Sequence, residues 1–111
     1  MSRETIKDIV FTGATDEQID SVLPKLVPQA TAPFFEKVIT TEENFGRVAK
    51  AYIETTLDRV ITLKAQRHVQ KMLGIKESET LEYGHVRLET APKQLADVLH
   101  KVSVSGNTIL T

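Results

Sequence analysis

Apolar residues recur along much of the chain three and four positions apart, the spacing that places side chains on one face of an α-helix. The first two such stretches occupy residues 2–11 and 15–26. The second begins with Thr15 and Gln18, which have the spacing of a helix capping box. Pro24 lies inside it and removes a backbone N–H donor. We therefore predict two short helices, the second ending or kinking near Pro24.

A stiff connector is predicted next. The segment 24–33 holds three of the four prolines and no glycine. It carries no charge run and no polar low-complexity stretch, so we interpret it as an ordered crossover between helices. The apolar residues Phe34, Phe35, Val38 and Ile39 follow it. They predict a short helix, with a buried strand as the alternative.

The longest helical pattern covers residues 42–73. Thr40 and Glu43 form a capping-box pattern at its start, and Gly74 is a suitable terminator. An unbroken helix of this extent would be about 50 Å long. Its apolar face drifts around the helix axis, which disfavours a regular coiled coil. The helix therefore either meets different neighbours along its length or breaks near residues 62–66.

The last third of the chain mixes two kinds of pattern. Residues 81–88 suggest a strand bulged at Gly84, with a short helix as the alternative. Residues 91–102 form the clearest amphipathic helix. Alternating apolar positions around Ser-Gly-Asn within residues 102–111 predict a short C-terminal β-hairpin.

Length and composition turn these elements into a fold prediction. The chain has 111 residues, of which 41% are hydrophobic, and these values suit one domain. We predict a mainly α fold, a single small helical domain over residues 1–111 built on one long central helix. No apolar run is long enough for a membrane span or a signal peptide, so we expect a cytoplasmic protein without membrane contact.

Metal and cofactor chemistry finds little support in the sequence. The chain has no cysteine, which excludes disulfides and cysteine-ligated metals. His68, His85 and His100 lack the spacing of paired helical zinc ligands, and the scattered glycines form no phosphate-binding loop. We expect no metal and no cofactor.

Catalytic patterns are equally weak. Asp97, His100 and the serines that follow hold the residue types of a catalytic triad, but no nucleophile elbow accompanies them. They are better interpreted as a surface ion pair near a helix end. Glu54 and Asp58 share a face of the expected long helix, where a solvated pair is the ordinary interpretation. We therefore expect that the protein is not an enzyme.

A local excess of positive charge is hidden by the formal net charge of −1. Residues 59–76 contain basic residues and no acidic one, so they form a stripe suited to phosphates or an acidic protein surface. A helix-turn-helix DNA-binding motif is disfavoured for two reasons. Gln70 occupies a position where close helix packing requires a small side chain, and the glutamates of the second helix would repel DNA phosphates. The basic stripe consists of Arg59, Lys64, Arg67, His68 and Lys71.

The drifting apolar face and the lack of a chemical site favour a non-catalytic interaction subunit or adaptor. We expect it to be an assembly component of a homo- or hetero-oligomeric complex, with other protein chains as partners. The alternative is a nucleic-acid-binding accessory or regulatory protein that uses the basic stripe. The expected apolar docking residues are Phe45, Tyr52, Ile53, Leu57, Val69, Met72 and Leu73.

Overall fold

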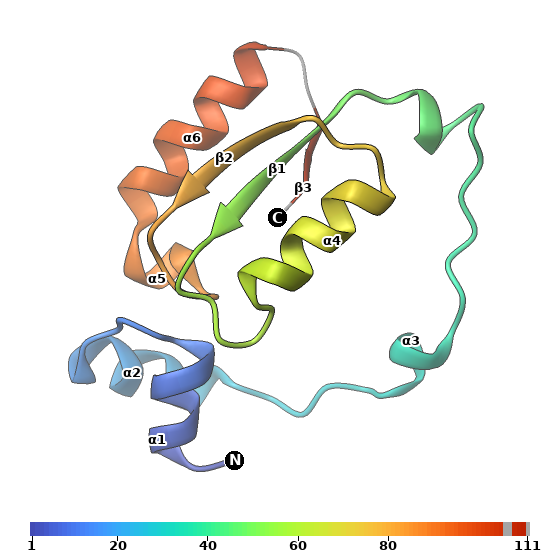
Figure 1. Cartoon of the computed structure of the whole chain (residues 1–111). Helices are drawn as coiled ribbons and strands as arrows, with labels where there is room; N and C mark the ends of the chain where they lie inside the picture. Colours follow the sequence, from blue (N-terminus) through green and yellow to red (C-terminus); the bar gives the residue numbers. More distant parts are fainter. Residues whose placement is uncertain (106–107, 111) are drawn as a thin grey trace.

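A small parallel β-sheet forms the centre of the computed structural model, which describes residues 1–105 and 108–110 (Figure 1). Its three strands have the order β2-β1-β3. They are β1 Lys50–Thr55, β2 Glu77–Leu81 and β3 Thr108–Leu110. The prediction of a mainly α domain on one long central helix is therefore wrong, although helices supply most of the regular structure.

The central strand β1 lies inside the segment expected to be a long helix. Residues 51–55 are all buried, and they include the β-favouring Tyr52, Ile53 and Thr55. A strand covered on both faces has no polar–apolar alternation, so its period cannot be distinguished from that of a helix. The capping box expected at residues 40–43 forms no helix cap, because no long helix follows it.

Helical crossovers connect the parallel strands, as parallel pairing requires. Helix α4, Leu63–Met72, joins β1 to β2, and helices α5, Arg87–Thr90, and α6, Pro92–Val104, join β2 to β3. Figure 1 shows α4 and α6 on opposite faces of the sheet. The helix break expected near 62–66 is also wrong, because α4 begins there, after strand β1 and a loop. Thr62 caps α4 by accepting a hydrogen bond from the Ala65 amide.

The C-terminal part of the prediction is half right. The amphipathic helix expected over 91–102 is confirmed as α6, with Leu95 and Val102 buried. The C-terminal hairpin is wrong, because β3 pairs in parallel with β1, from Lys50 opposite Thr108 to Tyr52 opposite Leu110. The strand expected over 81–88 is also wrong, since β2 ends at Leu81.

Two short helices at the N-terminus pack at the carboxyl end of the sheet (Figure 1). Helix α1, Arg3–Thr5, continues as the π-helical turn η1, Ile6–Val10, and helix α2, Asp16–Val22, continues as the 3-10 turn η2, Leu23–Lys25. The predicted Thr15–Gln18 capping box is present, and α2 ends as expected near Pro24. Their apolar faces meet in a core cluster of Phe11, Ala14, Ile19 and Val22.

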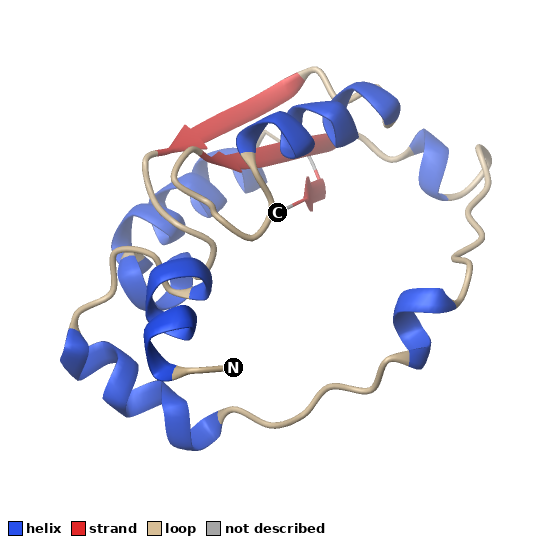
Figure 2. Ribbon diagram, turned by 60° about the horizontal axis from the view of Figure 1, so that its bottom comes forward, coloured by secondary structure: helices blue, strands red, loops and turns tan. Residues whose placement is uncertain are grey.

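Residues 26–44 form a long arm that arcs away from the sheet (Figure 2). It includes all but the first two residues of the predicted connector and only one short helix, α3, Ala32–Phe35, before the 3-10 turn η3, Phe45–Arg47. The apolar residues of the arm do not enter a core: Phe34 is 70% exposed and Phe35 is 86% exposed. The helix prediction for this segment is right only for its first residues.

Candidate functional site

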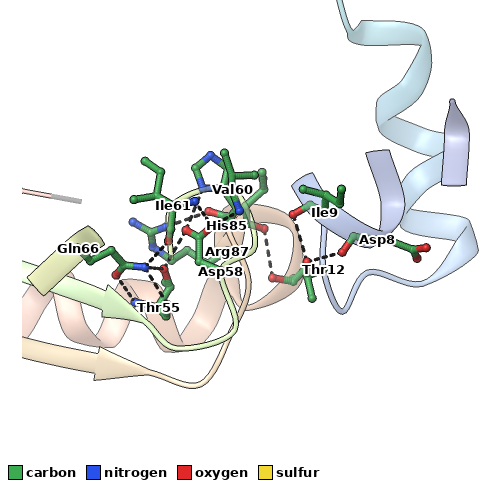
Figure 3. Close-up of polar contacts among 12 residues, drawn as sticks. Asp8, Ile9, Thr12, Thr55, Asp58, Val60, Ile61, Gln66, His85 and Arg87 are labelled. Atoms are coloured by element: carbon green, nitrogen blue, oxygen red, sulfur yellow. Dashed lines mark hydrogen bonds and ion pairs between the residues drawn. The ribbon is translucent and has the colours of Figure 1, made fainter. Parts of the chain in front are cut away.

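An aspartate and a histidine meet beyond the carboxyl ends of β1 and β2. The Asp58 Oδ2 atom lies 2.9 Å from His85 Nδ1 (Figure 3). Asp58 lies in the loop that leaves β1, and His85 lies between β2 and α5. Open parallel sheets bind their ligands in the crevice outside the carboxyl ends of the strands. The fold therefore places this pair where functional sites of such sheets are found.

The Asp58 carboxylate is buried and held by four donors. Its Oδ1 atom accepts from the amides of Val60 at 2.8 Å and Ile61 at 2.9 Å. Its Oδ2 atom accepts from the Thr55 hydroxyl at 3.1 Å, in addition to the contact with His85. Burial raises the Asp58 pKa, but the hydrogen bonds from His85 and the two amides outweigh burial and hold it below its usual range. Asp58 is therefore an ionised acceptor near neutral pH.

A second side chain fixes the loop that carries Asp58. Gln66 of α4 accepts from the Thr55 amide at 2.9 Å and donates to the Thr55 carbonyl at 2.9 Å. The same amide group donates to the Ile61 carbonyl at 2.8 Å. Gln66 is only 2% exposed, so these bonds form away from water. They tie the end of β1 to the far side of the Asp58 loop.

The state of Asp58 determines the tautomer of His85. An ionised carboxylate only accepts hydrogen bonds, so the neutral imidazole carries its proton on Nδ1 and donates it to Asp58. The lone pair of Nε2 is then free to accept a proton. The histidine side chain is 32% exposed and lines a cavity. This is the arrangement of an oriented general base.

A cavity of about 450 Å³ adjoins the pair. This volume is within the range of small-molecule sites, roughly 300–1,000 Å³. Tyr52 and Arg87 add polar groups to its wall beside the Asp58–His85 pair. The apolar part of the wall comprises Ile53, Ile61, Val86, Leu88, Leu95 and Leu99. An apolar cavity with a few convergent polar groups is the usual form of a ligand site.

The N-terminal helices support the loop that carries His85. Gly84 lies against Thr12 so closely that a Cβ atom at position 84 would be 2.6 Å from the Thr12 carbonyl oxygen. Val86 packs against the core cluster of the N-terminal helices. Gln18 donates to the carbonyl of Glu89, just beyond this loop, at 2.9 Å. The apolar pairing of α1 and α2 therefore helps to fix the histidine.

Glu54 is also buried, in a separate polar cluster between β1 and α4. Its carboxylate accepts from Gln70 at 2.8 Å, from Arg67 at 3.1 Å and from Thr80 at 3.1 Å. Burial raises the Glu54 pKa, but these hydrogen bonds outweigh it and leave the pKa below its usual range. The solvated pair expected for Glu54 and Asp58 is wrong, since both are buried and each has its own set of partners.

The predicted apolar docking residues do not form one surface. Tyr52 and Ile53 are buried in β1, while Leu57, Val69 and Met72 are exposed. Leu73 is 45% exposed after α4, and Phe45 is half-buried under the Lys50 ammonium, which lies 4.4 Å from its ring centre.

The basic stripe is only partly free. Lys64, His68 and Lys71 are exposed on α4. Arg67 bonds to Glu54, and Arg59 donates to the Asp8 carbonyl at 3.1 Å. Two of the five residues therefore have structural contacts.

The other sequence candidates separate in the structure. Asp97 forms a surface ion pair with Lys93 at 3.0 Å, in place of the one expected with His100. The Ser103 hydroxyl donates to the His100 carbonyl and not to its ring.

Within the described residues, no group of three or more His, Asp or Glu side chains is arranged to hold a metal ion. None of the helices in the described part of the chain could cross a membrane.

The chain matches no protein-family model and no curated protein. Its site must therefore be interpreted from its own geometry. Sequence analysis named Asp58 and His85 separately but missed their contact, because it joins residues 27 positions apart, and it did not single out Arg87 or Gln66. The available signal was positional: Asp58 lies five residues after the apolar run 51–53, and His85 follows a glycine.

Proposed function

We propose that the chain carries a histidine–aspartate general base that hydrolyses carboxylic esters bound in the adjoining cavity. The observation that carries the proposal is the 2.9 Å contact between the saturated, buried Asp58 carboxylate and His85 Nδ1 at the wall of the cavity. It departs from the expectation of a non-catalytic protein, which rested on sequence patterns alone.

The proposed step uses water as the nucleophile. His85 Nε2 takes a proton from a water molecule as the water oxygen attacks the ester carbonyl carbon. The tetrahedral intermediate expels the alcohol oxygen, which takes the proton back from the imidazolium. The products are a carboxylic acid and an alcohol, and His85 returns to its starting state. Asp58 holds the ring and stabilises the transient positive charge.

The topology offers one further support, at the level of fold analogy. Enzymes of the α/β-hydrolase type carry the acid and then the base of their Ser–His–Asp triads in this chain order, on a largely parallel sheet. Asp58 and His85 follow the same order, after β1 and β2. No described serine or threonine hydroxyl is hydrogen-bonded to His85. The proposal therefore assigns the attack to water.

The test is hydrolysis of 4-nitrophenyl butyrate by the whole chain and by a set of single variants. We expect His85→Gln and Asp58→Asn to lower the hydrolysis rate by about a hundredfold or more. His100→Gln is the matched control, because it removes an exposed histidine outside the cavity. Equal rates for wild type and a folded His85→Gln variant would overturn the proposal.

A second candidate function follows from the arm. Val38 and Ile39 are each 82% exposed, and Phe35 is exposed to a similar degree. Apolar residues gathered in this way usually mark a contact with another macromolecule. An interaction subunit, working in the cytoplasm with other protein chains, would use this segment. Sedimentation of the wild type against a Phe34→Ser/Phe35→Ser variant tests it.

A further inference from the structure

Arg87 brings a positive charge to the cavity wall, and no acidic side chain among the described residues pairs with it. Its Nη1 atom donates to the His85 carbonyl at 2.9 Å, which is the only hydrogen bond of its side chain to a described residue (Figure 3). The Nε atom is buried and has no acceptor. A donor with no exposed surface cannot be reached from the cavity, so the group left to bind a molecule there is Nη2, which makes no hydrogen bond to a described residue.

The geometry of the guanidinium narrows the choice of acceptor. With Nη1 engaged by a carbonyl and Nε covered by protein atoms, Nη2 is the nitrogen that remains to donate into the cavity. A carboxylate matches this donor in charge, and its charge-assisted hydrogen bond to a guanidinium is stronger than that of a neutral acceptor. A neutral carbonyl would satisfy one donor and leave the charge without a counter-ion.

The neighbouring acid is not free to serve as that counter-ion. The two oxygens of Asp58 already accept from His85, Thr55 and two amides. Tyr52, on the same wall, is a hydroxyl donor. Burial raises the Tyr52 pKa, more than the charge of Arg87 lowers it, so the phenol keeps its proton. Arg87 and Tyr52 thus both offer donors to the cavity.

We propose that Arg87 binds the carboxylate of the substrate, so that the cavity takes apolar molecules bearing a free carboxylate. Such a substrate places its hydrocarbon part against the leucines and isoleucines of the wall. Because Arg87 and His85 belong to one short segment and are joined by a hydrogen bond, the bound carboxylate sets the distance of the reacting ester from His85 Nε2. The ester chemistry in this inference rests on the proposed function, while carboxylate binding does not.

The first experiment measures binding alone, by calorimetry with 4-phenylbutyrate and its neutral isostere 4-phenylbutanamide. We expect the carboxylate to bind wild type about tenfold more tightly than the amide. Arg87→Gln removes this preference. Arg47→Gln is the matched control, since it removes an exposed arginine on η3, which is not part of the cavity wall. Arg87→Lys keeps the positive charge but lacks the planar guanidinium group, so it should retain part of the preference for the carboxylate.

The results separate the two proposals. Equal affinities of wild type for the two probes, binding of neither, or an undiminished preference in folded Arg87→Gln or Arg87→Lys would overturn the inference. The His85→Gln variant should keep the preference, because carboxylate binding does not need the base. If the protein does not hydrolyse esters but still prefers the carboxylate probe, the proposed function is wrong and Arg87 remains a carboxylate-binding residue.

A kinetic comparison completes the test. The 4-nitrophenyl monoester of adipic acid should have about tenfold higher kcat/KM than 4-nitrophenyl hexanoate in wild type, and equal kcat/KM in Arg87→Gln. Hydrolysis of both esters at equal kcat/KM by wild type would support the general base and contradict the role of Arg87.

Discussion

The side-chain amide of Gln66 bonds to both backbone groups of Thr55, accepting from the N–H at 2.9 Å and donating to the carbonyl at 2.9 Å. It occupies the position that a neighbouring strand would take beside the last residue of β1. The polar face of α4 therefore substitutes for sheet hydrogen bonds at the point where the chain turns toward Asp58.

Replacing Gln66 by leucine should destabilise the protein by at least about 2 kcal/mol, because buried backbone groups lose their partners. Urea unfolding measures the free energy of unfolding. Gln94→Leu is the matched control, since Gln94 is exposed on α6. A Gln66→Leu variant as stable as this control would show that water replaces the lost bonds.

Acid should destabilise the fold through Glu54. Its pKa is lower in the folded state than in the unfolded state, so the unfolded state binds its proton more readily as the pH falls. The stabilisation is complete above the ordinary glutamate pKa of about 4.3 and is lost as the pH falls through the folded value. Thermal melts from pH 7 to pH 3 should show a shallower fall in Tm for Glu54→Gln than for wild type. The pKa of Asp58 is also lowered, so Asp58 should account for the fall in Tm that remains in Glu54→Gln.

Charge reversal on α4 should affect the free energy of unfolding less at the exposed lysines than at the paired arginine. Lys64→Glu and Lys71→Glu change exposed positions, so each should alter the free energy of unfolding by less than about 0.5 kcal/mol. Arg67→Glu places a carboxylate against buried Glu54 and should cost clearly more. Equal stabilities of the three variants would show that Arg67 contributes nothing to the Glu54 cluster.

The elements best predicted from sequence are those whose signal is local. The Thr15–Gln18 capping box and the amphipathic stripe of α6 depend on neighbours three and four residues away. Strand β1 was missed because burial on both faces removes alternation, and α4 buries glutamines that resemble a solvated flank. The Asp58–His85 contact joins residues 27 positions apart, and only the parallel pairing of β1 with β2 brings their loops together.

Leu95→Ala should destabilise the protein by about 2–5 kcal/mol, because it leaves a cavity under the buried face of α6. Val104→Ala, at a position that is 72% exposed on the same helix, is the control and should cost little. Denaturant titration measures both. A small effect at Leu95 would identify α6 as peripheral to the core.

Gly84→Ala should lower both stability and hydrolysis, because the added Cβ would meet the Thr12 carbonyl oxygen at 2.6 Å. Backbone atoms cannot rotate away as a flexible side chain can, so either the N-terminal helices or the loop carrying His85 must move. We expect a loss of about 1–3 kcal/mol in the free energy of unfolding. Rates of 4-nitrophenyl butyrate hydrolysis, measured well below the melting temperature, should fall as well, since the displaced loop carries the proposed base. Thr12→Gly retains the backbone carbonyl and so should not rescue the variant. Unchanged stability and unchanged rate in Gly84→Ala would contradict the close packing of the N-terminal helices against this loop.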